Sequence, residues 1–130
     1  MNTKKILVVD DEQVIRLMLS SLLRRLGYNA IFSENGKQAI EIYKQYTLDI
    51  DIAIIDLQMP EMNGFETFER LKSIDPDIKV IFSSGRMDDQ LDRLVCESGS
   101  VCLAKPYKME QLSQALEELS AFSKFSMNDV

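Results

Sequence analysis

Three acidic residues, Asp10, Asp11 and Glu12, follow directly after the apolar run Ile6–Val9. Carboxylates that lie close together disfavour one another's ionised forms, so a protein seldom gathers them unless a cation is expected nearby. A hard divalent cation relieves the repulsion, and Mg²⁺ prefers one or two carboxylates, retained water molecules and phosphate oxygens as its ligands. The acidic run therefore predicts a cofactor site for Mg²⁺, with Mn²⁺ as an alternative ion.

Other polar side chains that suit the same chemistry also follow apolar runs. These are Asp56, then Ser84 with its neighbour Ser83 as the alternative, and Lys105. A metal ion and a lysine ammonium together balance the charge on a phosphoryl group while an aspartate oxygen attacks it in line. If the apolar runs are parallel strands of one sheet, their carboxyl ends bring these side chains together, and phosphoryl transfer is the predicted reaction.

Apolar runs alternate with helical patterns along the whole chain, without repeats or low-complexity segments. The predicted strands are Ile6–Val9, Asn29–Ser33, Asp51–Ile55, Ile78–Phe82 and Ser100–Leu103. Each is followed by a segment in which apolar residues recur at three- and four-residue steps, which is typical of an amphipathic helix. Five strands that alternate with five helices predict an α/β fold with a doubly wound parallel sheet.

Several polar residues mark where the predicted elements begin and end. Asn35 and Asn63 are predicted N-caps, and Gln38 stands at the position from which a side chain bonds back to the cap. The pair Asp75–Pro76 is predicted to end the third helix, because the residue before a proline disfavours helical geometry. Asp51 is predicted to be a solvated turn residue.

The size and charge of the chain exclude several classes of protein. At 130 residues it is long enough for one domain with a hydrophobic core; we assign residues 1–124 to that domain and 125–130 to a short C-terminal tail. A net charge of −6 disfavours binding to nucleic acid, which needs clustered Lys and Arg. No apolar run approaches the roughly 20 residues of a membrane span, and the N-terminus lacks a signal-peptide pattern, so a cytoplasmic protein that does not bind membranes is predicted.

The chain contains no histidine, which excludes catalysis by histidine and the usual zinc sites. Its two cysteines, Cys96 and Cys102, lack the spacing that is typical of a metal site. Free cysteine is among the most buried residue types and usually behaves as a small apolar side chain. Both cysteines are therefore predicted to be buried free thiols.

The segments ILVVDDE, IAIIDLQMPEMNGFE, VIFSSG and LAKPY occur in this order along the chain. Together they resemble the receiver domain of two-component response regulators, the CheY-like family, over essentially the whole sequence. The second segment is the most specific, because an Asp that ends an apolar run is followed, after two intervening residues, by Met-Pro-x-Met-Asn-Gly. The resemblance implies a flavodoxin-like sheet with strand order 2-1-3-4-5.

The resemblance also implies a function, namely a phosphorylation-activated signalling switch. Its phosphoryl group would come from a histidine kinase or a phosphotransfer protein, and the chain would be no enzyme beyond its own phosphorylation and dephosphorylation. Asp56 matches the residue that accepts the phosphoryl group, Lys105 the lysine that pairs with it, and Ser84 the hydroxyl residue that moves to bond one of its oxygens. Lys105–Pro106 matches a peptide bond that is usually cis in the family.

The magnesium ligands are implied by the same resemblance. Asp11 and Asp56 match the direct ligands, joined by the backbone carbonyl of Gln58. Asp10 matches an acid that reaches the metal mainly through water. The implied site thus draws its ligands from the ends of the first and third predicted strands.

Some positions depart from the family pattern or modulate it. Cys102 stands where receivers usually carry a Tyr or Phe whose ring swings inward on activation, so relay by a rotating aromatic ring is not expected here. Gln58 and Arg86 flank the predicted phosphoryl site, and in the family residues at these positions influence how long the phosphate survives. An unknown downstream protein is expected to bind the face formed by the fourth helix, the fifth strand and the fifth helix.

Three other functions are compatible with parts of this pattern. A receiver-like interaction module that takes no phosphate usually lacks one of the acids or the lysine, all of which are present here. An aspartate-nucleophile phosphatase of the haloacid dehalogenase type would carry a second Asp as its general acid where Gln58 stands. A flavodoxin-like electron carrier would need a phosphate-binding loop in place of the acidic run.

Overall fold

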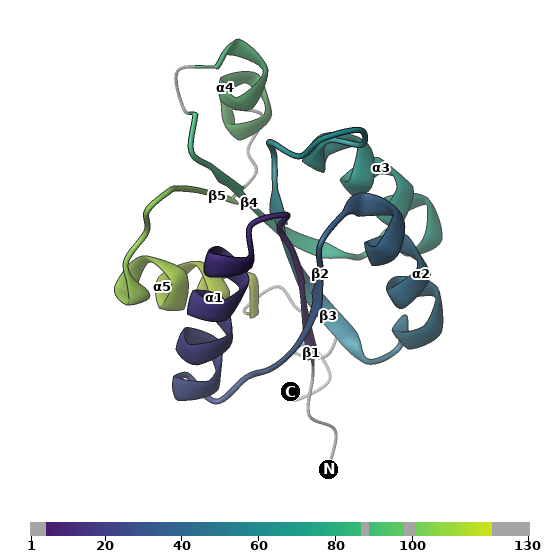
Figure 1. Cartoon of the computed structure of the whole chain (residues 1–130). Helices are drawn as coiled ribbons and strands as arrows, with labels where there is room; N and C mark the ends of the chain where they lie inside the picture. Colours follow the sequence, from purple (N-terminus) through teal and green to yellow (C-terminus); the bar gives the residue numbers. More distant parts are fainter. Residues whose placement is uncertain (1–4, 87–88, 98–100, 121–130) are drawn as a thin grey trace.

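Figure 1 shows a computed structural model of the chain, which describes residues 5–86, 89–97 and 101–120. The expected domain end at residue 124 and the expected tail 125–130 lie outside the described residues. So does Ser100, which was predicted to begin the fifth strand. Within the described residues, no helix is both long enough and apolar enough to cross a membrane.

A five-stranded parallel sheet forms the centre of the molecule (Figure 1). Its strands are β1 Lys5–Val9, β2 Asn29–Ser33, β3 Ile50–Asp56, β4 Lys79–Ser84 and β5 Val101–Ala104. They are arranged in the order β2-β1-β3-β4-β5, which confirms the predicted order 2-1-3-4-5 and the doubly wound α/β fold. Asp56 on β3 pairs in register with Ser83 on β4, and Ser84 pairs with Ala104 on β5, so the predicted site residues end neighbouring strands.

The central strand β3 is buried along its entire length, because helices cover both faces of the sheet. This burial includes Asp51, which has 6% of its surface exposed. The prediction of a solvated turn residue at Asp51 is therefore wrong. Asp51 follows Ile50, and the strand begins one residue earlier than its apolar pattern indicated, which places Asp51 inside the sheet.

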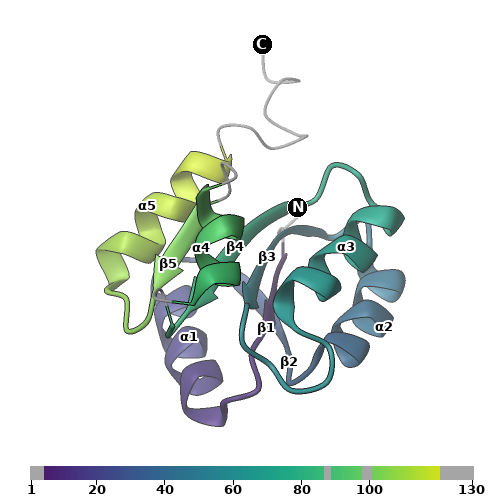
Figure 2. The ribbon, with the colours of Figure 1, turned by 90° about the horizontal axis from the view of Figure 1, so that it is seen from above.

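Helices pack on both faces of the sheet, as the alternation of elements predicts (Figure 2). They are α1 Gln13–Arg25, α2 Gly36–Tyr46, α3 Gly64–Ile74, α4 Gln90–Glu97 and α5 Met109–Ser120. Leu19 and Leu23 of α1 share one apolar core with Leu112 and Leu116 of α5. The other core contains Tyr43 of α2, Leu71 of α3 and Val95 of α4.

Side-chain caps begin two of the helices, at the predicted residues. Asn63 and Glu66 form a complete capping box at α3, in which each side chain accepts a hydrogen bond from the other residue's backbone. Asn35 caps α2 by accepting from the backbone of Gln38 at 2.7 Å. The Gln38 side chain, however, accepts from the backbone of Glu34 at 2.8 Å, one residue before the predicted partner.

Cys102 lies in β5, opposite Phe82 of β4, and packs against the core on the α2 and α3 face. It is disulfide-bonded, so the prediction of a free thiol at this position is wrong. A disulfide depends on the spatial separation and direction of two side chains, which residue preferences alone do not reveal. The side chain of Cys96, the other cysteine of the chain, lies outside the described residues.

Candidate functional site

Lys105 follows β5, an edge strand of the sheet, and its side chain extends towards the carboxyl ends of β3 and β1. Its Nζ atom is 2.9 Å from Asp10 Oδ2, 3.2 Å from Asp56 Oδ2 and 3.3 Å from Glu12 Oε1. The lysine backbone is fixed by its neighbour in the sheet, because Lys105 N donates to the carbonyl oxygen of Ser84 at 2.7 Å. The ends of β1, β3 and β5 thus bring together an ammonium and carboxylates that are far apart in the sequence.

An acidic cluster surrounds this ammonium. It consists of Asp10, Asp11, Glu12 and Asp56, whose nearest carboxylate oxygens all lie within 4.8 Å of one another. Asp10 and Asp56 are each 2% exposed, whereas Asp11 and Glu12 face solvent. One lysine does not neutralise this many acids, and an all-oxygen ligand set suits a hard cation, so these residues fit Mg²⁺.

Glu12 was not among the assigned site residues, although it both joins the cluster and pairs with Lys105. The signal for it was its place in the acidic run after β1. Arg16, one turn into α1, supports the same loop by donating to the carbonyl oxygen of Asp10 at 2.7 Å. These contacts hold the two sequential aspartates at the end of β1.

Burial raises the pKa of Asp56 to about 7 from its ordinary value of 3.8. A hydrogen bond from the backbone N–H of Gln58, 3.0 Å from Asp56 Oδ1, and the positive charge of Lys105 both act in the opposite direction. Burial alone would lower the pKa of Lys105, but its hydrogen bond to Asp10 and the charge of Asp56 outweigh this and leave the pKa raised. Lys105 therefore stays charged, while ionisation of Asp56 is favoured by additional positive charge.

The loop after β3 positions Asp56 through an unusually close backbone contact. Gly64, the first residue of α3, packs so tightly that an added Cβ atom would lie 2.2 Å from the carbonyl oxygen of Asp56. Its backbone N–H donates to the carbonyl oxygen of Leu57 at 3.2 Å. The Asn63 capping box and this glycine together set the path of the chain from Asp56 to α3.

Ser84 is the last residue of β4 and has 1% of its surface exposed. Its Oγ donates to the Asp92 carboxylate and accepts from the backbone N–H of Arg86 at 2.9 Å. The neighbouring Ser83, also 1% exposed, lies opposite Asp56, and its carbonyl oxygen accepts from Leu57 N at 2.9 Å. Of the two serines, Ser84 is the one whose hydroxyl joins the polar network beside Gln58.

Asp92 of α4 belongs to this network but was not singled out in the sequence. It is 1% exposed and accepts a hydrogen bond from Gln58 Nε2 at 2.9 Å as well as the one from Ser84. In the sequence it reads as an ordinary polar residue of a helix. The available signal was weak: Asp92 lies three residues before the buried Val95 and so shares its face of the helix.

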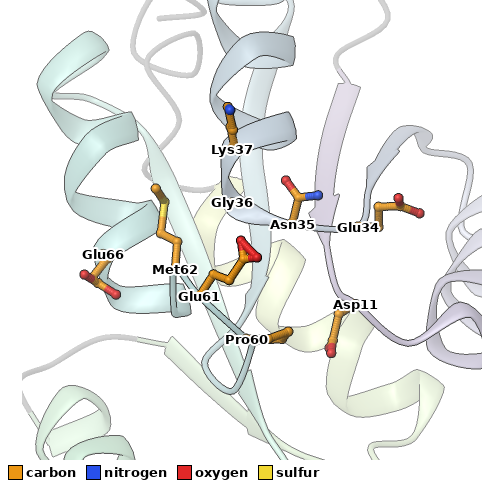
Figure 3. Close-up of a pocket in the computed structure, with 9 residues that line it drawn as sticks. All are labelled: Asp11, Glu34, Asn35, Gly36, Lys37, Pro60, Glu61, Met62 and Glu66. Atoms are coloured by element: carbon orange, nitrogen blue, oxygen red, sulfur yellow. The ribbon is translucent and has the colours of Figure 1, made fainter.

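A pocket of about 760 Å³ opens beside the acidic cluster, and Asp11 forms part of its wall (Figure 3). Glu34, Glu61 and Glu66 also line it, against one lysine, Lys37. This side of the site therefore carries an excess of negative charge. Such a field attracts cations and the positively charged groups of a binding partner.

Comparisons with known proteins agree with this geometry. The family model for the response regulator receiver domain matches residues 6–117. Chemotaxis protein CheY of Thermotoga maritima is 33% identical over 90% of this chain and 98% of that protein. Sporulation initiation phosphotransferase F of Bacillus subtilis is 30% identical, over 91% of the chain and 94% of that protein.

Matches also occur within much longer proteins and among solved structures. The chain is 31% identical to part of the autoinducer 1 sensor kinase/phosphatase LuxN of Vibrio campbellii, spanning 85% of this chain but only 13% of that protein. The response regulator TrrA of Thermotoga maritima, solved in complex with Mg(2+)-BeF, superimposes with a TM-score of 0.76 at 29% identity. The superposition covers 89% of this chain and 98% of that one.

Proposed function

The chain belongs to the response regulator receiver domain family, and from this premise we propose that Asp56 is the residue that becomes phosphorylated. Receiver domains are phosphorylation-activated switches of two-component signalling, and this chain is one of them. The assignment of Asp56 is supported above all by one observation. A buried carboxylate, a second buried carboxylate and a lysine ammonium meet at the carboxyl edge of the sheet.

The proposed reaction joins one carboxylate oxygen of Asp56 to phosphorus. The bond between phosphorus and the donor atom breaks, and its electron pair leaves with the donor. Asp11, Asp56 and the backbone carbonyl of Gln58 would hold Mg²⁺, and Asp10 would reach it through water. The bound ion would neutralise charge on the phosphoryl oxygens. Lys105, already 3.2 Å from Asp56 Oδ2, would turn from the carboxylate to the new phosphoryl group.

The proposed output is a change in the face formed by α4, β5 and α5. Ser84 and Lys105 would move towards the phosphoryl group, and both are joined to this region through the end of β5 and through Asp92. The phosphoryl donor would be a histidine kinase or a phosphotransfer protein in the cytoplasm, and an unknown protein would bind the changed face. Gln58 and Arg86, beside Asp56 and Ser84, would set the lifetime of the phosphoryl group.

The test is the intact mass of the protein after incubation with acetyl phosphate and Mg²⁺. We expect a gain of one phosphoryl group that is absent in Asp56→Asn. Asp49→Asn is the matched control, because Asp49 is an exposed aspartate just before β3 and should leave the gain unchanged. A folded wild-type protein that gains nothing would instead be an interaction module, and repeated turnover of a phosphate monoester would indicate a phosphatase.

A further inference from the structure

Asp92 is a buried carboxyl group that the proposed phosphorylation reaction does not use. It lies in the first turn of α4, and 1% of its surface is exposed. Its two oxygens have different partners: Ser84 Oγ donates to Oδ2, and Gln58 Nε2 donates to Oδ1 at 2.9 Å. A single side chain of α4 therefore binds two side chains that flank the proposed phosphoryl site.

The Ser84 hydroxyl has only one proton to donate. That proton is directed to Asp92, while the backbone N–H of Arg86 occupies an acceptor site of the same oxygen at 2.9 Å. An ionised phosphoryl group offers acceptor oxygens, so Ser84 must use the same proton to bind it. Binding of Ser84 to Asp92 and binding of Ser84 to a phosphoryl oxygen are therefore mutually exclusive.

Gln58 is held in a related way. Its backbone N–H donates to Asp56 Oδ1 at 3.0 Å, so the residue lies directly beside the proposed acceptor. Its side-chain amide is directed to Asp92. As long as this contact persists, that N–H proton of Gln58 is engaged with α4 and is not available to a phosphoryl group or an attacking water molecule.

We propose that Asp92 is a positioning residue that holds Ser84 and Gln58 in the unphosphorylated arrangement and competes with the phosphoryl group for the Ser84 proton. This inference rests on the proposed function of Asp56. Because the competition is reciprocal, phosphorylation releases Asp92, and release of Asp92 favours phosphorylation. The freed carboxylate belongs to α4, so the competition links the chemistry directly to the proposed output face.

The experiment compares the wild-type protein with four variants. Three are the single substitutions Asp92→Ala, Asp92→Asn and Ser84→Ala, and the fourth carries both alanine substitutions. Arg93→Ala, an exposed neighbour on the same helix, is the control. The first measurement is the initial rate of phosphorylation by acetyl phosphate. We expect Asp92→Ala to raise it by about three- to tenfold, the change that corresponds to the net contribution of one typical hydrogen bond. Asp92→Asn, which keeps one acceptor oxygen, should give an intermediate rate.

The double variant separates positioning from a general effect on the fold. If Asp92 acts through Ser84, Asp92→Ala should change the rate by less than about twofold in the Ser84→Ala background. An equal acceleration in both backgrounds would overturn the proposal, and so would an Asp92→Ala variant that is folded but no faster than wild type.

A second measurement does not depend on phosphorylation. Amide hydrogen exchange of residues 89–97 in the unphosphorylated protein should be faster in Asp92→Ala and in Ser84→Ala, with no further increase in the double variant. Independent, additive effects there would contradict the positioning role. A wild-type protein that takes no phosphate would refute the proposed function of Asp56. The hydrogen-exchange rates of the two single variants and the double variant would still decide whether Asp92 holds Ser84.

Discussion

At the scale of single residues, Asp56 meets two requirements that conflict. In the proposed reaction it must be ionised to attack phosphorus, yet it is 2% exposed, and burial disfavours the charged form. Its raised pKa of about 7 shows that Lys105 and the Gln58 N–H compensate only partly for the lost solvation. When no cation is bound, ionisation of Asp56 is therefore unfavourable. A bound cation would stabilise the ionised carboxylate.

Because ionisation of the buried Asp56 carboxyl group is unfavourable, Asp56→Asn should stabilise the folded protein in a metal-free buffer. The pKa of Asp56 is 3.8 when unperturbed and about 7 in the folded state. Between these values the folded state binds more protons than the unfolded state, so the contribution of Asp56 to stability falls as the pH rises. We expect Asp56→Asn to raise the free energy of unfolding by about 2 kcal/mol at about pH 8 and by little at about pH 4.

Urea unfolding in a metal-free buffer at both pH values measures this difference. Asp49→Asn, at an exposed position, should change the free energy of unfolding by less than about 0.5 kcal/mol at either pH. A destabilised Asp56→Asn protein at the higher pH would show that the ion pair with Lys105 outweighs the burial of the carboxylate.

The residues that could be predicted are those whose position follows from the strand they end. Asp10, Asp56 and Lys105 each follow an apolar run, and parallel strands carry such residues to one edge. Asp92 could not be found this way, because its contacts with Ser84 and Gln58 depend on how α4 packs against the end of β4. Glu12 is an intermediate case, since its place in the acidic run was evident but its contact with Lys105 was not.

At the scale of elements, the connection from β3 to α3 fixes the direction of Asp56. The Asn63 capping box sets the first turn of α3, and Gly64 lets that turn pack directly against the backbone of Asp56. Both were visible in the sequence as a cap followed by a glycine. The close approach itself was not visible, because Gly64 packs against a strand end that the sequence does not place in contact with it.

Gly64→Ala should therefore destabilise the protein by about 2 kcal/mol or more, because the added Cβ would overlap the carbonyl oxygen of Asp56. Gly85→Ala is the matched control, since a Cβ there would make only ordinary contacts with Lys105, the nearest at 3.9 Å. Thermal unfolding monitored by circular dichroism compares the two variants. Equal melting temperatures would show that α3 moves to accommodate the added Cβ without loss of stability.

Other element boundaries could be predicted only approximately. The Asn35 cap was correct, but the Gln38 side chain binds one residue further back, because that choice depends on the path of the chain before the helix. The prediction for Asp51 was wrong because β3 begins one residue earlier, at Ile50, which places Asp51 inside the sheet. The disulfide at Cys102 depends on a spatial partner, which periodicity does not provide.

At the scale of the whole molecule, β4, β5 and α4 connect the acidic site to the proposed output face. Ser84 O accepts a hydrogen bond from Lys105 N, and Asp92 joins Ser84 to α4, so both residues that are proposed to contact the phosphoryl group are coupled to that face. To convert a protein that is 1% in its active conformation into one that is 99% active, the active conformation must be stabilised by about 5.5 kcal/mol relative to the inactive one. A charged phosphoryl group with several assisted hydrogen bonds can supply energy on this scale.

Phosphorylation should therefore change the backbone amide chemical shifts of α4 and β5 and of the adjoining face of α5, as well as those around Asp56. Two-dimensional nuclear magnetic resonance spectra of the wild-type protein with Mg²⁺, before and after addition of beryllofluoride, measure this change.

Asp56→Asn in the same solutions corrects for effects of the ions alone. The first residues of α2, Gly36 and Lys37, line the acidic pocket. Within the described part of the chain, none of the hydrogen bonds of Ser84, Gln58 and Asp92 leads to the rest of α2, which should therefore shift least. Shifts that remain confined to the ends of β1 and β3 would mean that the charge is accommodated locally, and the coupling through Asp92 and β5 would then be too weak to operate a switch.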